Sequence, residues 1–312
     1  MRRYLCQKML MWKYLLLIQA LLIPVLFENV CLKSQADNPQ LPFLPTAPAS
    51  RAFELQTSNF ELRTSKDSLF PLLSLPLLAR FATADNLGNT YIVTAANSIE
   101  KYASDGRFLT WYSDNRRGQV TWLDVSNPLK VLVWYADFRT VLFLDRSLTQ
   151  LGEVNLIQVG YPDVRVVAAA LDGNLWLYDE VNFRLLKITP EGEKRAESQS
   201  LNLLEYTPRQ PALLREQDNR VYLADRTAGL GVFNAFGQFE RTWKSAQVVS
   251  DFQVVDNQLI YLSDSSIVAE RWPLPEHAEI LLPDSLRSLP KWLGPRRLFV
   301  QQAGTLKVFT VR

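Results

Sequence analysis

A hairpin-like unit recurs six times along this chain, and the recurrence limits the possible folds more than any other feature. In its clearest copy, Leu171–Thr189, the turn pair Gly173-Asn174 precedes the apolar run Leu175–Tyr178, and a polar turn then leads to a second apolar run, Leu185–Ile188. Two short apolar runs joined by a polar turn are typical of a β-hairpin. Each copy therefore predicts at least two adjacent antiparallel strands.

The six copies follow one another at a nearly constant spacing. Their turn markers stand at residues 89, 130, 174, 220, 258 and 297, so the steps are 41, 44, 46, 38 and 39 residues. A period in this range, with several strands per unit, is the signature of a β-propeller blade. The second strand of each unit is apolar on both faces, as in Val131–Tyr135, which fits a blade packed between two neighbours. We therefore predict an all-β, six-bladed β-propeller over residues 51–312.

Four strands are expected in each complete blade. In the first two blades the predicted strands are Phe81–Thr83, Thr90–Thr94, Ile99–Tyr102 and Phe108–Tyr112, followed by Thr121–Val125, Val131–Tyr135, Thr140–Leu144 and Leu151–Leu156.

Closure of the ring requires a strand from outside the repeats. The last copy, Arg297–Val311, shows only two clear strands, whereas short alternating segments at Ala52–Leu55 and Phe60–Leu62 precede the first full blade. We expect an N-terminal strand to complete the last blade, because closure removes the exposed sheet edge between the first and last blades.

The turn residues also carry a family resemblance. The chain has D-x-x-G-N at Asp85–Asn89, Lys101-Tyr102 with Asp105-Gly106 after it, and Asp172–Asn174 with Lys187-Ile188 and Gly192 after it. These patterns resemble NHL-type six-bladed propeller repeats over most of residues 51–312. The segment Asn127–Leu132 also resembles parts of envelope propellers from Gram-negative bacteria. Such propellers include ligand-binding scaffolds and a few hydrolases, so the resemblance implies the fold and leaves the function open.

The N-terminus has the features of a signal peptide. Basic residues at 2, 3, 8 and 13 precede an apolar segment, Tyr14–Phe27, and Ser34-Gln35-Ala36 supplies small residues for a signal peptidase. We predict that residues 1–36 are removed by cleavage after Ala36. The apolar segment is shorter than the roughly 20 residues that span a bilayer, so no integral membrane span is expected after cleavage. A start at Met9 or Met11 would give a leader of more usual length.

Cysteine usage and location are consistent with export. Both cysteines, Cys6 and Cys31, lie in the predicted leader, so the mature chain would contain no disulfide, which suits a bacterial periplasm. Lipidation at Cys31 is the less favoured alternative, because Val30 precedes it where a small residue is usual. We expect a periplasmic or outer-membrane-associated protein.

The charge of the mature chain excludes one class of partner. Removing the five basic residues and one acidic residue of the leader from totals of 34 and 32 leaves 29 basic and 31 acidic residues, a net charge of −2. Because the basic excess belongs to the leader, no nucleic-acid partner is expected.

A proline-rich linker is predicted at residues 37–50. Pro39, Pro42, Pro45 and Pro48 recur every three residues, which is the period of a polyproline II helix. We interpret the segment as a spacer; a docking peptide for an aromatic groove is the alternative.

Candidate catalytic and metal-binding residues are few. His277 is the only histidine, is expected in a loop between blades five and six, and has no G-x-S-x-G motif to accompany it. Four acids follow the second strands, namely Asp137, Asp179, Asp225 and Asp264. In calcium-dependent propeller lactonases, acids gather on the axis, but Asp in a tight turn bonds its own backbone. We therefore prefer the turn interpretation and predict no catalytic residue, no metal and no cofactor.

Aromatic and basic residues are the candidate partner contacts. Trp111, Trp122, Trp134 and Trp176 fall in predicted strands, where burial between blades is expected, and Trp111 is interpreted as an outer-strand packing residue. The candidate surface anchors near strand ends are Trp243, Trp272 and Trp292. Arg116 and Arg117 form a basic loop that could contact an acidic partner.

These observations predict a non-catalytic, exported β-propeller that acts as a protein-interaction scaffold in the bacterial cell envelope. Binding would use blade-connecting loops or the axial mouth, with an unidentified envelope protein as partner. The alternatives are a calcium-dependent, lactonase-like hydrolase and a carbohydrate-binding propeller.

Overall fold

The computed structural model describes residues 68–244, 251–255, 257–271 and 276–311, all of which belong to one compact unit, Ser58–Arg312. The predicted signal peptide, the linker at 37–50 and the segments Ala52–Leu55 and Phe60–Leu62 lie outside the described residues. In the described part of the chain, no helix is long and apolar enough to span a membrane.

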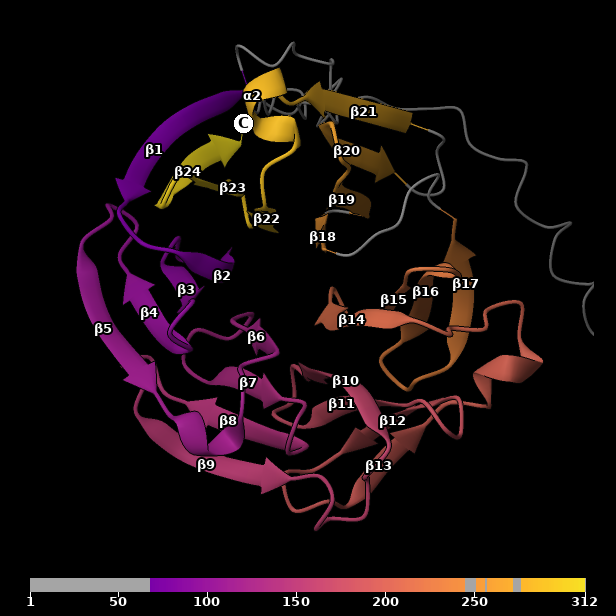
Figure 1. Ribbon diagram of the computed structural model, residues 1–312. Coiled ribbons are helices and arrows are strands. Elements are labelled where there is room, and N and C mark those ends of the chain that lie inside the picture. The colour runs from indigo at the N-terminus through magenta and orange to yellow at the C-terminus, as the bar shows by residue number, and fades with distance from the viewer. Residues whose placement is uncertain (1–67, 245–250, 256, 272–275, 312) are drawn as a thin grey trace, which may run out of the picture. The chain divides into compact units, whose positions relative to one another are not determined.

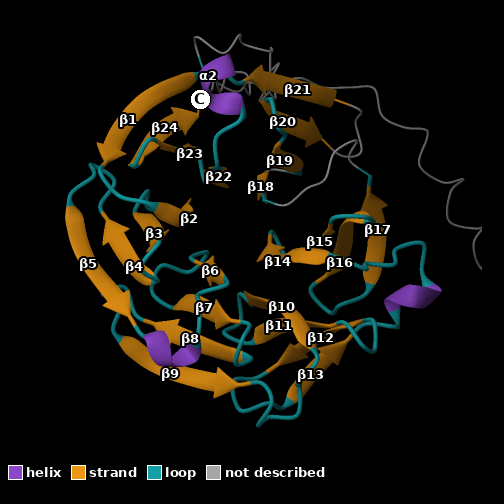
Figure 2. Cartoon of the chain, in the orientation of Figure 1, coloured by secondary structure: helices purple, strands orange, loops and turns teal. Residues whose placement is uncertain are grey.

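The described residues form six four-stranded antiparallel sheets arranged as blades around a central axis (Figure 1). Strands dominate and the helices are short (Figure 2). The first three blades, each from its inner to its outer strand, are β2 (Ala79–Ala84), β3 (Thr90–Thr94), β4 (Ser98–Tyr102) and β5 (Phe108–Ser113); β6 (Trp122–Asp124), β7 (Val131–Tyr135), β8 (Thr140–Leu144) and β9 (Gln150–Asn155); and β10 (Val164–Ala169), β11 (Leu175–Asp179), β12 (Arg184–Ile188) and β13 (Lys194–Glu197).

The other three blades repeat this order. They are β14 (Pro211–Gln217), β15 (Arg220–Asp225), β16 (Gly229–Asn234) and β17 (Phe239–Trp243); β18 (Phe252–Val255), β19 (Gln258–Leu262), β20 (Ser266–Arg271) and β21 (Glu276–Leu281); and β22 (Lys291–Gly294), β23 (Arg297–Gln302), β24 (Thr305–Val311) and β1 (Leu69–Leu75). Helical turns occur at α2 (Asp284–Arg287), Asn115–Arg117 and Leu201–Leu203. The predicted all-β, six-bladed propeller is confirmed.

The last blade is closed by an N-terminal strand, as predicted. β1 pairs with β24 from Leu69 opposite Val311 to Leu75 opposite Leu306. The register shifts between Pro71 and Leu73, and a proline is tolerated there because β1 is an outer edge strand and the missing N–H breaks no inner ladder. The closing strand therefore lies after the segments that the alternation pattern favoured.

Apolar side chains fill the space between every pair of adjacent blades. Six buried clusters are present among the described residues, one at each blade junction. Between blades 1 and 2, for example, Tyr91 and Val93 pack with Leu123 and Val133. The second strands are buried along both faces, as in β7 and β11, which explains their unbroken apolar sequences.

Each junction also contains a side-chain oxygen that accepts a hydrogen bond from a backbone N–H of the neighbouring blade. With the acceptor named first, the pairs are Asn97 and Val120 (2.9 Å), Asp124 and Ala169 (3.1 Å), Glu216 and Leu171 (3.0 Å), Gln217 and Val254 (3.2 Å), Asp251 and Leu293 (2.9 Å), and Gln301 and Ala79 (2.8 Å). These bonds satisfy backbone N–H groups at the blade edges, where no neighbouring strand of the sheet accepts from them.

One predicted detail is wrong. His277 lies in β21, opposite Glu270 of β20, and not in a loop. The nearby prolines, Pro273 and Pro275, are typical of a loop in the sequence. The outer strand of blade 3 is β13, which ends at Glu197, and Leu201–Leu203 after it form a helical turn.

Candidate functional site

A cavity of about 920 Å³ opens at one mouth of the propeller axis. In blades 1, 2 and 5 the inner strand (β2, β6 or β18) begins at the end of the blade where the antiparallel second strand ends. For example, Phe252 at the start of β18 lies opposite Tyr261 near the end of β19. The cavity is lined at this end by residues of blades 1, 2, 5 and 6, namely Arg80, Phe81, Val120, Thr121, Trp122, Asp251, Leu262, Ser263, Asp264, Ser265, Leu289, Lys291 and Trp292. Its size is that of a typical small-molecule site.

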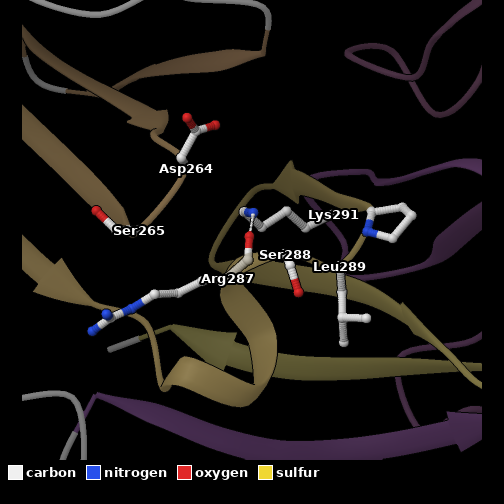
Figure 3. Close-up of a pocket in the computed structure, with 7 residues that line it drawn as sticks. Asp264, Ser265, Arg287, Ser288, Leu289 and Lys291 are labelled. Carbon is white, nitrogen blue, oxygen red and sulfur yellow. Dashed lines mark hydrogen bonds between the residues drawn. The ribbon is translucent and has the colours of Figure 1, made fainter.

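A second, more open pocket of about 660 Å³ adjoins this cavity and shares Asp264, Ser265, Leu289 and Lys291 with it. Figure 3 shows the ammonium group of Lys291 turned toward the carbonyl oxygen of Arg287, which accepts its hydrogen bond at 2.5 Å. The short helix α2 therefore holds one end of the Lys291 side chain.

Aromatic rings form part of the cavity wall. Phe81 and Trp122 lie with their ring centroids 4.7 Å apart and their planes at 46°. Trp122 also packs against the cluster between blades 4 and 5, and the Arg215 guanidinium lies 5.9 Å from its ring centroid. Trp292 is half-buried against the cluster between blades 6 and 1. Flat apolar surfaces are therefore available beside the polar groups of the cavity.

Two cations of the cavity are positioned by uncharged oxygens. Arg80 donates to Asn97 Oδ1 (3.2 Å) and to the Val120 carbonyl (2.6 Å). Burial lowers the pKa of Lys291, and the nearby Asp264 opposes this shift. Neither Arg80 nor Lys291 has a carboxylate oxygen within 4.0 Å among the described residues, so both cations can interact with an incoming anion.

Asp251 is the buried acid of the cavity, and burial raises its pKa. Its Oδ2 accepts the bond from Leu293 N, whereas Oδ1 lies 4.0 Å from Arg215 Nη2 and accepts no hydrogen bond from any described residue. Because Oδ1 has almost no solvent-accessible surface, Asp251 lines the cavity without presenting this oxygen to it.

The predicted basic loop is held by ion pairs. Arg116 and Arg117 both pair with Asp114, and Arg117 also pairs with Glu153 of β9. The Arg116 side chain is 83% exposed and that of Arg117 is 14% exposed. Of the two, Arg116 is the more accessible to a partner.

The tryptophans are distributed differently from the prediction. Trp243 is buried and donates to Glu270 Oε2 at 2.8 Å, so its expected surface position is wrong. Trp292 lines the axial cavity, and Trp272 lies outside the described residues. Trp111 was expected to be packed but is 61% exposed, because β5 is the outermost strand of blade 1 and no described strand pairs with its outer edge.

The four acids after the second strands do not form an axial ring. Asp179 accepts from Asn182 N, and Asp225 accepts from the N–H groups of Thr227 and Ala228, so both are turn residues as predicted. Asp137 and Asp264 lie in exposed turns. Among the described residues, no group of three or more His, Cys, Asp and Glu side chains is arranged to hold a metal.

A second candidate surface lies on the outside of blades 6 and 1. It consists of exposed apolar residues of the adjacent outer strands β1 and β5, and we call it the outer wall: Phe70, Leu72, Phe108, Leu109 and Trp111. The two strands meet at Gly106, where a Cβ would lie 3.1 Å from the Leu73 side chain. β1 and β5 contain no charged residue, whereas each of the other four outer strands contains at least one. Charge normally protects an outer strand from pairing, so the outer wall is unusual in this molecule.

Comparisons with known proteins identify the fold. The chain is similar to the solved structure of streptogramin B lyase, with 16% identity over 78% of this chain and 86% of that one, and a TM-score of 0.52. It is also similar to virginiamycin B lyase from Staphylococcus aureus, solved as a catalytically inactive histidine-to-alanine variant with quinupristin (14% identity, 78% and 98% coverage, TM-score 0.53) and as a selenomethionine-substituted form (13%, 77% and 98%, 0.53).

No protein-family model matches the chain, and no curated protein gives a significant match. At this level of identity the similarity extends to the fold alone, which is the β-propeller.

Proposed function

We propose that this chain is a non-catalytic β-propeller that binds a protein partner through the outer wall, as a scaffold in the bacterial cell envelope. The observation that carries the proposal is the concentration of exposed apolar side chains on β1 and β5. Large exposed apolar patches mark interaction surfaces, and Trp and Phe are prominent among residues that dominate binding energy.

The backbone of β5 adds a second means of binding. β5 pairs with β4 on one side, and no described strand pairs with its other edge. An extended segment of a partner could add to this edge, so that main-chain hydrogen bonds provide affinity and the apolar side chains provide specificity. The partner that fits is therefore a protein with an uncharged, apolar strand.

The position of His277 favours binding over catalysis. In virginiamycin B lyase a histidine-to-alanine variant is catalytically inactive, whereas the single histidine of this chain lies exposed on β21, the outermost strand of blade 5. No histidine of the described residues lines the axial cavity. Histidine-dependent chemistry at the axis would therefore lack its main residue.

The cellular location and the finer family are also part of the proposal. The basic and apolar leader, residues 1–36, supports export to the periplasm or the outer membrane. The turn residues support an NHL-type propeller: Asp85 Oδ1 accepts from the N–H groups of Leu87 (3.0 Å) and Asn89 (2.8 Å), and Gly88 has a φ of 83°. Asp and Gly are therefore required by the geometry of this turn.

Affinity capture from envelope membranes of the native cell tests the proposal, with the wild-type chain, Trp111→Glu and Phe236→Glu as baits. Phe236 is the matched control, because it is 74% exposed in a turn of blade 4, away from the outer wall. We expect one protein to be retained by the wild type and by Phe236→Glu and lost by Trp111→Glu, and purified preparations of the two proteins to reproduce the difference.

Retention of the same partner by Trp111→Glu would contradict binding through the outer wall. Recovery of the propeller alone would contradict the scaffold function itself. Circular dichroism of each variant checks that the charge substitution leaves the fold intact.

A further inference from the structure

The proposed scaffold function does not involve the axial cavity, which lies on a different surface from the outer wall. Its wall combines two cations, two acids and three aromatic rings within about 920 Å³. Small-molecule sites in proteins are concave, of about 300–1,000 Å³, with apolar walls and a few convergent polar groups.

The cations require an anion on the ligand. Arg80 and Lys291 come from adjacent blades, 1 and 6, and their packed inner strands bring the two side chains to one cavity. Their hydrogen bonds go to Asn97 Oδ1 and to the carbonyls of Val120 and Arg287, none of which carries a charge. A carboxylate between them would gain charge-assisted hydrogen bonds.

The acids require hydrogen-bond donors on the same ligand. Asp251 Oδ1 is buried and accepts no hydrogen bond, and Asp264 is exposed at the rim with no basic group within 4.0 Å among the described residues. Both groups would repel a second anion, and the exposed Asp264 can accept an O–H bond. The hydroxyl of Ser263 is already engaged with Ser266, so the Asp264 carboxylate is the main acceptor.

The aromatic rings require a ligand with an apolar, ring-sized face. Phe81 and Trp122 provide one aromatic surface, and half-buried Trp292 provides another. A pyranose ring presents such a face, together with hydroxyl donors along its edge. A sugar that also bears a carboxylate therefore matches the aromatic, acidic and basic parts of the wall at once.

We propose that the axial cavity is a binding site for an acidic oligosaccharide of uronic-acid type. The carboxylate of one sugar residue lies between Arg80 and Lys291, a hydroxyl donates to Asp264, and its ring lies against Trp122 or Trp292. Binding requires no bond to form or break.

Isothermal titration calorimetry on the full mature chain tests this site with three probes. Trigalacturonate is the acidic sugar, maltotriose is a neutral sugar of the same length, and N-acetylphenylalanine has a carboxylate and an apolar ring without sugar hydroxyls. We expect measurable binding of trigalacturonate, at least about ten-fold tighter than either other probe, and weaker binding as salt is raised. Equal or tighter binding of maltotriose or N-acetylphenylalanine, or no binding of trigalacturonate, would overturn the proposal.

Variants locate the binding to the cavity. Lys291→Gln should weaken trigalacturonate binding by about ten-fold, and Asp264→Asn should change the affinity for the acidic sugar without creating affinity for N-acetylphenylalanine. Lys194→Gln is the matched control, since this cation lies on outer strand β13 of blade 3, paired with Glu197. Arg80→Gln is a second test whose fold is checked by thermal melting, because Arg80 also bonds the Val120 carbonyl. Unchanged affinity in both Lys291→Gln and a folded Arg80→Gln would place the sugar elsewhere and overturn the assignment.

Discussion

Gly231 lies in β16 against the ring of Tyr206, where a methyl group has no space. A Cβ at Gly231 would be 2.5 Å from Tyr206 Cε1, and the ring is held because the buried Tyr206 hydroxyl donates to the Leu223 carbonyl. We expect Gly231→Ala to lower the free energy of unfolding by about 1–3 kcal/mol through overpacking. Urea denaturation measures the change.

Gly152 provides the matched control for this substitution. It lies in β9, and a Cβ there would meet nothing within 4 Å. Gly152→Ala should change the free energy of unfolding by no more than about 0.5 kcal/mol. Similar losses in the two variants would show that steric contact with Tyr206 is not the cause.

Asp114 makes the stability of the fold depend on pH in the acid range. Its side chain accepts from Arg116 and pairs with Arg117, and the hydrogen bonds from Arg116 hold the pKa of Asp114 at about 2, below its ordinary value of 3.8. Because the folded pKa is the lower one, the carboxylate stabilises the fold above about pH 4, and this contribution is lost as the pH falls toward 2.

We therefore expect Asp114→Asn to cost about 1 kcal/mol at pH 7, after allowance for solvent screening, and almost nothing near pH 2. Urea denaturation of both proteins across this pH range measures the difference. A cost that stays constant with pH would contradict the assignment to the ionised carboxylate.

Individual residues were predictable where a single turn defines their role. Asp179 and Asp225 accept from N–H groups two or three residues later, and such local bonds can be inferred from the sequence alone. Asp251 could not be interpreted in this way, since its partners, Leu293 and Arg215, come from other blades. The exposure of Trp111 and the burial of Trp243 depend in the same way on which blade lies next to each strand.

Among the elements, the second and third strands were the most predictable. β3, β7 and β8 begin and end at the predicted residues, because strands buried on both faces appear as unbroken apolar runs between turns. The outer strand β21 was missed, since it is partly exposed and carries charged residues. β1 was not predicted at Leu69–Leu75 because its sequence does not alternate and contains Pro71.

The junction between blades 6 and 1 depends on Gln301 of β23. Its side chain accepts from Ala79 N at 2.8 Å and donates to the Leu77 carbonyl at 3.2 Å. We expect Gln301→Ala to lower the free energy of unfolding by about 1–2 kcal/mol, because both backbone groups lose a partner, and to accelerate hydrogen exchange at the Ala79 amide.

Gln238→Ala tests whether this effect is specific to the junction. Gln238 is exposed in the turn before β17, where its side chain accepts only from Asn234. We expect little change in stability or in exchange at Ala79. If Gln301→Ala behaves like this control, the side-chain bond does not hold the junction.

For the whole molecule, the fold was predictable because a repeat of about 40 residues with several strands per unit is typical of a propeller blade. The axial cavity was not, because its residues come from four blades and from opposite ends of the chain, as Arg80 and Lys291 do. The outer wall also depends on closure, since β1 lies next to β5 only when the N-terminal strand completes blade 6. The cavity and the outer wall therefore both depend on closure of the six-bladed ring.

A designed disulfide between β1 and β24 tests this closure most directly. Ser74 and Lys307 are register partners across the two strands, and a chain that begins at residue 37 contains no other cysteine. In a closed ring, Ser74→Cys combined with Lys307→Cys should form an intramolecular disulfide under mild oxidation and raise the melting temperature. Free thiols, or disulfides that form only between molecules, would contradict a propeller closed by its N-terminal strand.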